Sequence, residues 1–375
     1  MPERHATLSA SSAHRWMHCP PSVKASAHIP DTAGGEAAKE GTAAHALAEH
    51  KLNKLFGVKT RKPRSTYINA DMERYTDEYA EYVYDVYSRL EDPVKTLFVE
   101  HQVDFSHLVP AGFGTADALI LSNNVLHVCD LKYGEGIIVD ASENPQLMLY
   151  ALGALYEFDI IFDQIQTVHL HIYQPRRDNI STFTISTSDL AAWGEKQVKP
   201  VAALADAGEG EFNAGEWCTF CKLKPTCRAR ADENLKTIGE AFGKTAELTD
   251  VEIAHICTRA PHIKRWLADV GKHALSEALA GKTYAGLKVV AGRSTRKYKD
   301  EKAAIAAAQA GGYDDIFEKN LIGIPAMEKL MGAENFQKIL GDLIYKPEGS
   351  PVLVPETDKR EPIRTTTPAD AFGEN

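Results

Sequence analysis

Two acids and one lysine have the types and spacing of a metal-dependent hydrolytic site. Asp117 lies in one apolar stretch, and Asp130 and Lys132 lie in the next, both with the two-residue alternation of β-strands. A two-residue turn at Asn123-Asn124 would pair Asp117 directly with Asp130, and Asn tolerates the positive φ that such turns need. Lys132 is two residues further on, so it shares their face of the sheet.

Opposed carboxylates need a physical reason, because like charges on cross-strand neighbours are destabilising. A divalent cation supplies one, since hard cations prefer carboxylate oxygens. A lysine beside the cation can hold an attacking water or stabilise charge that develops on a phosphate. The alternatives are a slipped register, or an aspartate that faces solvent. Glu100, on the preceding strand, could also reach this site.

Two helical segments bring further candidates. Gln146 and Tyr150 lie four residues apart, so they share one helical face and could point at a phosphate. His45 lies in an Ala-rich segment whose small side chains allow close packing, and it could be a third metal ligand. The alternatives are a tyrosine and a histidine of an ordinary hydrophobic core.

Three of the six cysteines are closely spaced, Cys218, Cys221 and Cys227. Cys19 is the best fourth ligand, and it would tie the N-terminal segment to a point about 200 residues away along the chain. Four thiolates suit either an iron–sulfur cluster or a structural zinc ion. The alternative is three unrelated cysteines. Cys129 and Cys257 are interpreted as small buried hydrophobic residues.

The hydrophobic periodicity predicts a small sheet flanked by helices. Strands are expected at 96–105, 115–121, 125–132, 167–173, 182–187 and 288–291, and helices at 35–56, 71–91, 143–157, 249–280, 301–311 and 325–342. A further helix begins at a Thr187 or Ser188 cap and ends near Ala207. Residues beyond about 240 look like a separate helical appendage, and the Pro-rich tail from 345 onward is predicted to be extended or disordered.

The bulk properties exclude some classes of function. The chain has 375 residues and a net charge of −10, which argues against a protein that coats nucleic acid non-specifically. Basic clusters at 59–64, 176–177, 222–230 and 293–299 are either a local DNA-binding strip or solvated surface. No apolar run is long enough for a transmembrane helix or signal peptide, so we expect a cytoplasmic protein with no membrane partner.

Together these residues resemble the RecB-type branch of the PD-(D/E)XK nuclease superfamily. The matching segments are Gly41-Thr42-x-x-His45, Gly114-Thr115-Ala116-Asp117, Asp130-Leu131-Lys132 and Gln146-x-x-x-Tyr150. One early and three late cysteines are similar to the AddB nuclease domain and the CRISPR-associated RecB-like exonucleases. The whole chain, including 346–355, resembles an uncharacterised phage and prophage family.

The resemblance implies an α/β (α+β) fold with a restriction-endonuclease-like core, in which a mixed central sheet is flanked by helices. It implies a nuclease domain at 1–240, a helical region at 241–345 and a tail at 346–375. The implied ligands of Mg²⁺ or Mn²⁺ are His45, Asp117, Asp130 and the Leu131 carbonyl. Lys132 would position water, and Gln146 and Tyr150 would support the site and the DNA strand. Cys19, Cys218, Cys221 and Cys227 would hold a [4Fe–4S] cluster.

The expected function is a DNA nuclease, more specifically an exonuclease, acting in phage replication, recombination or repair inside a bacterial host cell. Its partners would be single- or double-stranded DNA and other phage replication or recombination proteins. Many relatives have Glu where this chain has Asp130, and both are hard oxygen ligands. The alternative is a non-catalytic DNA-binding or scaffold protein of a phage replication module.

Overall fold

The computed structural model describes residues 6–30, 35–162, 164–240, 248–290, 299–311, 316–317, 321 and 323–344. The chain divides into two units, one formed by 1–246 with 262–271 and the other by 247–261 with 272–375. The predicted tail and most of the basic segment 293–299 lie outside the described residues. The candidate site lies in the first unit.

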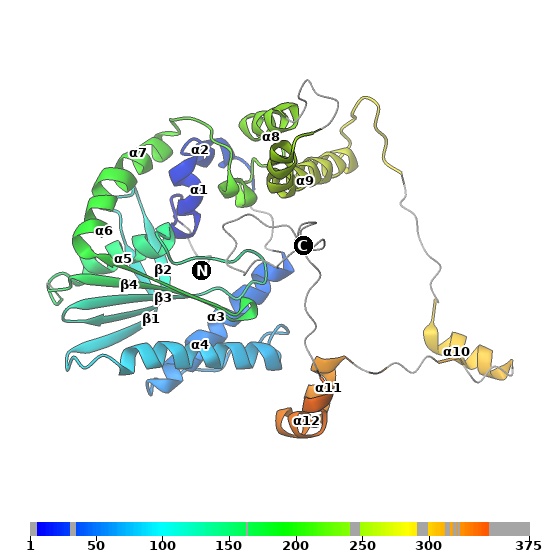
Figure 1. Ribbon diagram of the computed structural model, residues 1–375, viewed down its shortest axis with the longest axis horizontal. Helices are drawn as coiled ribbons and strands as arrows, with labels where there is room; N and C mark the ends of the chain where they lie inside the picture. Colours follow the sequence, from blue (N-terminus) through cyan, green and yellow to red (C-terminus); the bar gives the residue numbers. More distant parts are fainter. Residues whose placement is uncertain are drawn as a thin grey trace, which may run out of the picture. The chain divides into compact units, whose positions relative to one another are not determined.

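Five strands form one mixed sheet in the order of the chain (Figure 1). They are β1 (Lys95–Asp104), β2 (Phe113–Ser122), β3 (Val125–Leu131), β4 (Thr167–Gln174) and β5 (Asn179–Ser186). Neighbouring strands are antiparallel except β3 and β4, which are parallel. A parallel pair needs a crossover, and α5 (Pro145–Phe158) supplies it. The expected mixed sheet flanked by helices is confirmed.

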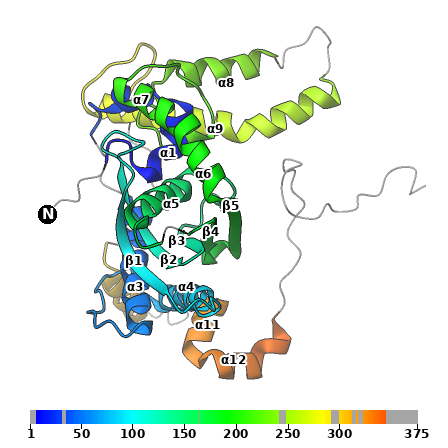
Figure 2. The ribbon, with the colours of Figure 1, turned by 90° about the vertical axis from the view of Figure 1, so that its left-hand side faces the viewer.

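The two faces of the sheet pack against different helices (Figure 2). Leu119 and Val128 point into a core shared with α5, whereas Ile120 and Cys129 point into a core shared with α3 (Glu36–Leu55) and α4 (Ala70–Ser88). Successive side chains of a strand alternate between faces, so apolar strands buried on both faces are expected here.

The hairpin register follows the prediction, although its turn does not. Ala118 pairs with Cys129 and Leu121 with Leu126, which is the register expected for a turn at Asn123-Asn124. Neither asparagine has a positive φ, so the expectation of a left-handed turn was wrong. The side chain and backbone of Asn123 instead bond to the carboxylate of Asp92, which stabilises the turn from outside the hairpin.

Several helix ends differ from the sequence-based expectation. The helix after β5 is capped by Ser186, whose Oγ accepts from Asp189 N at 3.0 Å, rather than by Thr187 or Ser188. It runs as α6 (Thr187–Trp193), a π-turn (Gly194–Val198) and α7 (Lys199–Ala207). Three helices were not predicted, α1 (Ala13–His18), α2 (Ser22–Ser26) and α8 (Arg228–Glu240). The first two are too short to show a helical period.

The remaining helices are α9 (Asp250–Leu279), α10 (Glu301–Ala310), α11 (Ile324–Met331) and α12 (Ala333–Leu340). One long helix was expected at 325–342, but Gly332, with a φ of 76°, separates α11 from α12. The strand expected at 288–291 is also wrong, because residues 288–290 form no strand. Within the described part of the chain, no helix combines the length and apolar character needed to cross a bilayer.

Candidate active site

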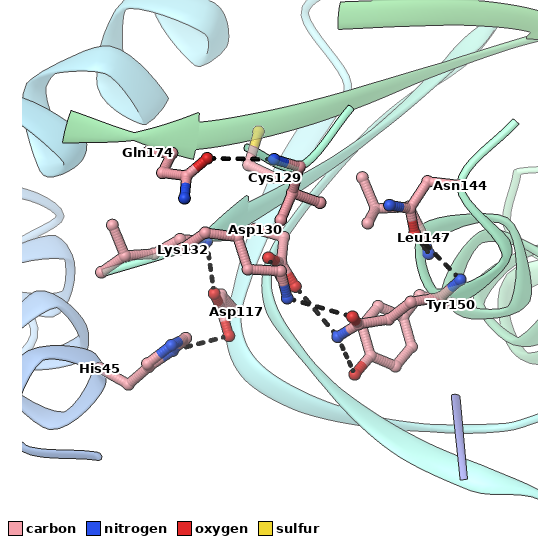
Figure 3. Close-up of polar contacts among 12 residues, drawn as sticks. His45, Asp117, Cys129, Asp130, Lys132, Asn144, Leu147, Tyr150 and Gln174 are labelled. Atoms are coloured by element: carbon pink, nitrogen blue, oxygen red, sulfur yellow. Dashed lines mark hydrogen bonds and ion pairs between the residues drawn. The ribbon is translucent and has the colours of Figure 1, made fainter. Parts of the chain in front are cut away.

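The side chain of Asp117 joins the hairpin to α3 (Figure 3). Its Oδ2 accepts a hydrogen bond from the backbone N–H of Leu131 at 2.7 Å, which holds the carboxylate at the end of β3. Its Oδ1 lies 3.1 Å from Nδ1 of His45. Ala43 and Ala44 are buried beside His45, so the helix can lie close to its neighbours. The structure therefore brings together two residues that are 72 positions apart in the chain.

Glu100 completes a group of three possible metal ligands. Ligand atoms of His45, Glu100 and Asp117 all lie within 4.8 Å of one another, and no other such group occurs in the described part of the chain. Glu100 stands between the cross-strand pairs Val99–Ala118 and His101–Ala116, at the position opposite Asp117. Its φ of 48° is rare for a residue that is not glycine. Such strain, of about 1–3 kcal/mol, tends to occur where a side chain is aimed at a functional site.

Asp130 and Lys132 form the second half of the site. Lys132 Nζ lies 2.7 Å from Asp130 Oδ2, and this ion pair is only partly exposed. Apart from the ammonium group, that buried oxygen has no well-aligned hydrogen-bond donor among the described residues. Buried carboxylate oxygens normally have such donors, so this oxygen of Asp130 can still bind a cation.

Gln146 connects this pair to α5. Its Nε2 donates to Asp130 Oδ1 at 3.2 Å and to the Tyr150 hydroxyl at 3.1 Å, and its Oε1 accepts from Lys132 Nζ at 3.1 Å. Asn144 caps the helix by accepting from the N–H groups of residues 146 and 147, which fixes where α5 begins. Gln146 and Tyr150 thus share one helical face, as their spacing predicts, and Gln146 contacts both Tyr150 and Asp130.

Gly114 has a steric role beside the site. A Cβ at this position would lie 2.7 Å from the ring of Tyr150, closer than van der Waals contact permits. The glycine therefore allows α5 to approach β2. This explains in physical terms why a glycine precedes Asp117 by three residues.

Burial and mutual charge perturb the ionisation of these groups. Burial lowers the pKa of His45, but Asp117, Asp130 and Glu100 outweigh burial and raise it to about 9. Burial, together with repulsion from Asp117, raises the pKa of Glu100 to about 7. Burial also raises the pKa of Asp130, whereas His45 and the Leu131 N–H outweigh burial and lower that of Asp117. This excess of buried acids fits a divalent cation, which would stabilise their charged forms.

All predicted site residues of this region lie together, and their roles differ in one respect. The acid closest to His45 and Asp117 is Glu100, which the sequence argument left outside its main set, and Asp130 is paired with Lys132 instead. Finding Glu100 from sequence would require the register of β1 on β2. That register depends on the eight-residue segment that joins them, whose conformation has no simple sequence signature.

The four predicted cysteine ligands line one cavity. Cys19 follows α1, Cys218 lies in the 3₁₀ turn Glu216–Phe220, and Cys221 and Cys227 follow in the same segment. Arg15 and Lys224 also line this cavity. Among the described residues none of the cysteines forms a disulfide.

The thiols do not show the close spacing of a single tetrahedral zinc site. No three of the described cysteines have sulfur atoms that all lie within 4.8 Å of one another. Thiolates on one tetrahedral zinc ion, with bonds of about 2.3 Å, would be closer, at about 3.8 Å. In a [4Fe–4S] cluster each thiolate binds a different iron atom, so its thiolates stand further apart. The backbone N–H of Gly215 lies 3.5 Å from Cys218 Sγ, and such donors tune iron–sulfur centres.

The remaining two cysteines do not join this cavity. Cys129 is buried in the sheet, as expected, and burial raises its pKa well above the usual value. Cys257 is exposed on α9, so the expectation that it is buried was wrong.

Comparison with known proteins identifies a family. Residues 5–361 match the family described as "Protein of unknown function (DUF2800)". The chain belongs to this family. A solved structure described as "Crystal structure of SSO0001" shares 13% sequence identity over 61% of this chain and 89% of that chain, with a TM-score of 0.28, a likeness too weak to carry an argument. The chemistry of this DUF2800 member must therefore be argued from its own residues.

Proposed function

We propose that this protein is a Mg²⁺- or Mn²⁺-dependent deoxyribonuclease with a PD-(D/E)XK core of the RecB type. The observation that carries the proposal is the group His45, Glu100 and Asp117, whose ligand atoms all lie within 4.8 Å, next to the Asp130–Lys132 pair. A hard cation among carboxylates, with a lysine beside it, is an arrangement that can catalyse phosphodiester hydrolysis. Exonuclease activity is the more specific form of the proposal.

Each side chain has a defined part in this reaction. His45, Glu100, Asp117 and Asp130 would hold the cation. When bound, the cation polarises a phosphoryl oxygen and lowers the pKa of water. Lys132 orients the attacking water and stabilises charge that develops on the phosphate. The carbonyl of Leu131 stays a predicted ligand.

Gln146 determines where the lysine can reach. Its amide contacts Asp130, Lys132 and Tyr150 at once, so it holds the ammonium group beside the acids. Burial, with repulsion from Asp130, raises the pKa of Tyr150, so its hydroxyl remains protonated and can donate to a phosphate oxygen.

We propose that the cysteine cavity holds a [4Fe–4S] cluster that fastens the N-terminal helices to the segment before α8. Replacement of Cys19 by Ala should lower the iron content from about four atoms per chain and destabilise the protein. Cys257→Ala is the matched control, because this exposed cysteine lies outside the cavity. Full iron content in Cys19→Ala would contradict the proposed ligand set. A wild-type protein that binds no iron after anaerobic reconstitution would contradict the cluster itself.

The biological setting is a proposal that rests on the resemblance of the whole chain to an uncharacterised phage and prophage family. A nuclease of this kind would act on DNA during phage replication, recombination or repair in the bacterial cytoplasm. Its other partners would be proteins of the same phage module.

The decisive experiment is cleavage of end-labelled single- and double-stranded DNA with Mg²⁺ or Mn²⁺. Lys132→Ala should lower the rate by about 10²–10³-fold, the usual effect of removing one charge-stabilising group. Lys199→Ala is the matched control, since Lys199 is exposed and pairs with Glu195 four residues earlier on the same face of the helix. Equal cleavage by both variants would refute the assignment. If wild type binds DNA but never cleaves it, the protein is a scaffold.

A further inference from the structure

Two adjacent isoleucines are exposed on the loop that joins β3 to α5. Ile137 and Ile138 are 55% and 52% exposed, and they follow Lys132 of the candidate active site closely in the chain. Single exposed apolar side chains are common on protein surfaces, so exposure alone does not indicate a function. This pair differs from such residues in how its loop is held and in what lies beside it.

A buried glutamine at the end of β4 holds the backbone of this loop. The Gln174 amide nitrogen donates to the carbonyl oxygens of Gly134 and Ile137, at 3.0 and 2.9 Å. Its oxygen accepts from the N–H of Val139 at 3.1 Å. Gln174 is 2% exposed, and a buried amide whose polar atoms are all bonded makes its surroundings rigid. The two isoleucines are therefore attached to a fixed backbone.

Two arginines follow Gln174 in the turn after β4. Arg176 bonds to the carboxylates of Glu135 in the same loop and of Glu40 on α3, so its guanidinium group is occupied. Arg177 is exposed and forms no ion pair or hydrogen bond with the residues that the structure describes. The turn is thus fastened to the loop by one arginine, while the charge of the next is available to an anion.

The loop and the turn both adjoin the candidate active site. The backbone N–H of Lys132 donates to the carbonyl oxygen of Tyr173 at 2.9 Å, so the parallel strands β3 and β4 end side by side. The loop continues from the first strand and the turn from the second. We call residues 134–138 together with 175–177 the rim of the site.

A DNA strand offers the two kinds of surface that the rim can contact. Its phosphates are anions that suit an unpaired arginine. Its bases have apolar faces, and isoleucine is among the side chains that proteins insert between base steps. These faces are accessible in a single strand, where proteins use them for binding without sequence preference. Within a duplex they are covered by the neighbouring base pairs.

We propose that the rim binds unpaired bases of the DNA strand that enters the active site, so that the preferred substrate is single-stranded DNA. Ile137 and Ile138 contact the bases, and Arg177 binds a phosphate of the same strand. This inference rests on the proposed nuclease function for the kind of polymer that reaches Lys132. Binding at the rim is nevertheless measurable without cleavage.

Fluorescence anisotropy of a labelled oligonucleotide tests this assignment, with Ca²⁺ in place of Mg²⁺ and with a gel to verify that the DNA stays intact. The double variant Ile137→Ser/Ile138→Ser should bind the single strand about tenfold more weakly, and its duplex at most about twofold more weakly. The matched control is Ile160→Ser/Ile161→Ser, an adjacent pair of exposed isoleucines beyond the end of α5. This pair lies about 20 Å along the helix axis from Gln146, so both affinities should stay unchanged.

A single strand that lacks bases separates contact with bases from contact with phosphates. Wild type should bind this abasic strand about tenfold more weakly than normal DNA, whereas the isoleucine variant should bind the two about equally. Arg177→Gln should weaken binding of both and reduce the slope of log affinity against log salt by about 0.7, the value for one phosphate of a single strand. Arg89→Gln is the control, since Arg89 is exposed and pairs with Asp85.

The outcomes distinguish this inference from the proposed function. No loss of affinity in the isoleucine variant, or an equal loss for single strand and duplex, would overturn the rim and leave the nuclease proposal intact. The expected changes in binding, in a wild type that cleaves no DNA with Mg²⁺, would refute the nuclease and support the rim. A wild type that binds no DNA would overturn both. Circular dichroism of each variant should match wild type, because the replaced side chains are exposed.

Discussion

Replacement of Asp117 by Asn offers a direct measurement of the electrostatics at the candidate site. Asn retains an oxygen that can accept the Leu131 N–H bond, so the hairpin should persist, whereas the charge facing His45 disappears. In metal-free wild type the pKa of His45 is raised to about 9 from an ordinary 6.5. In Asp117→Asn it should fall toward 6.5, because burial then opposes a weaker set of carboxylates.

The magnitude follows from the size of this fall. A fall of about 2.5 in pKa corresponds to about 3 kcal/mol. The side chain of His45 is 33% exposed. Solvent screening therefore reduces the contribution of this ion pair to the unfolding free energy to about 1–2 kcal/mol. Because the folded-state pKa is raised, this stabilisation is complete below pH 6.5 and is lost as the pH rises through about 9.

Titration of the His45 ring resonances by NMR measures the pKa, and urea unfolding at pH 6 and pH 9 measures the stability. The difference in unfolding free energy between wild type and Asp117→Asn should shrink between these two pH values. Glu100→Gln is a matched variant that should lower the pKa of His45 by less, because Glu100 contributes less than Asp117. A wild-type His45 that titrates near 6.5, unaffected by either change, would refute the reasoning.

The same titration connects to the proposed cation. A metal ligand must be an unprotonated imidazole, so binding of Mg²⁺ at pH 8 should release about one proton from His45. Calorimetry in two buffers of different ionisation enthalpy measures that proton. Binding of Mg²⁺ without proton release would exclude His45 from the ligands.

Two further predictions concern packing and acid stability. Gly114→Ala should destabilise the fold by about 1–3 kcal/mol in urea unfolding, because the added methyl group overlaps Tyr150. Gly134→Ala is the control and should not destabilise the fold, since a Cβ there has nothing within 4 Å. Equal stabilities of the two variants would contradict the steric argument. In metal-free protein the unfolded chain takes up a proton at His127 before the folded chain does, so stability should fall from pH 6.5 toward pH 3. In His127→Leu the loss of unfolding free energy between pH 6.5 and pH 3 should be smaller by about 2–4 kcal/mol. An unchanged loss would show that another group is responsible.

The local sequence pattern determined most of the elements that carry the site. Alternation placed β2 and β3, the short turn set their register, and four-residue spacing placed Gln146 and Tyr150 on one helical face. These features depend on contacts between residues that are near in sequence, so the spacing of the residues predicts their geometry. Helix caps and short helices, such as the Ser186 cap and α1, were harder to predict from the sequence. Several neighbouring residues can satisfy the same backbone groups at a helix end.

The sequence by itself determined which residue types are available: opposed acids, a lysine, a histidine on a small-residue helix and a spaced set of cysteines. Only the tertiary structure decided that Glu100, rather than Asp130, stands with His45 and Asp117, because that depends on how β1 registers on β2. It likewise placed Gln174 and Arg176 against the loop after β3, since the parallel pairing of β3 and β4 follows from a crossover of 35 residues. Long-range register has no local signature, and it is this register that turns separate side chains into sites.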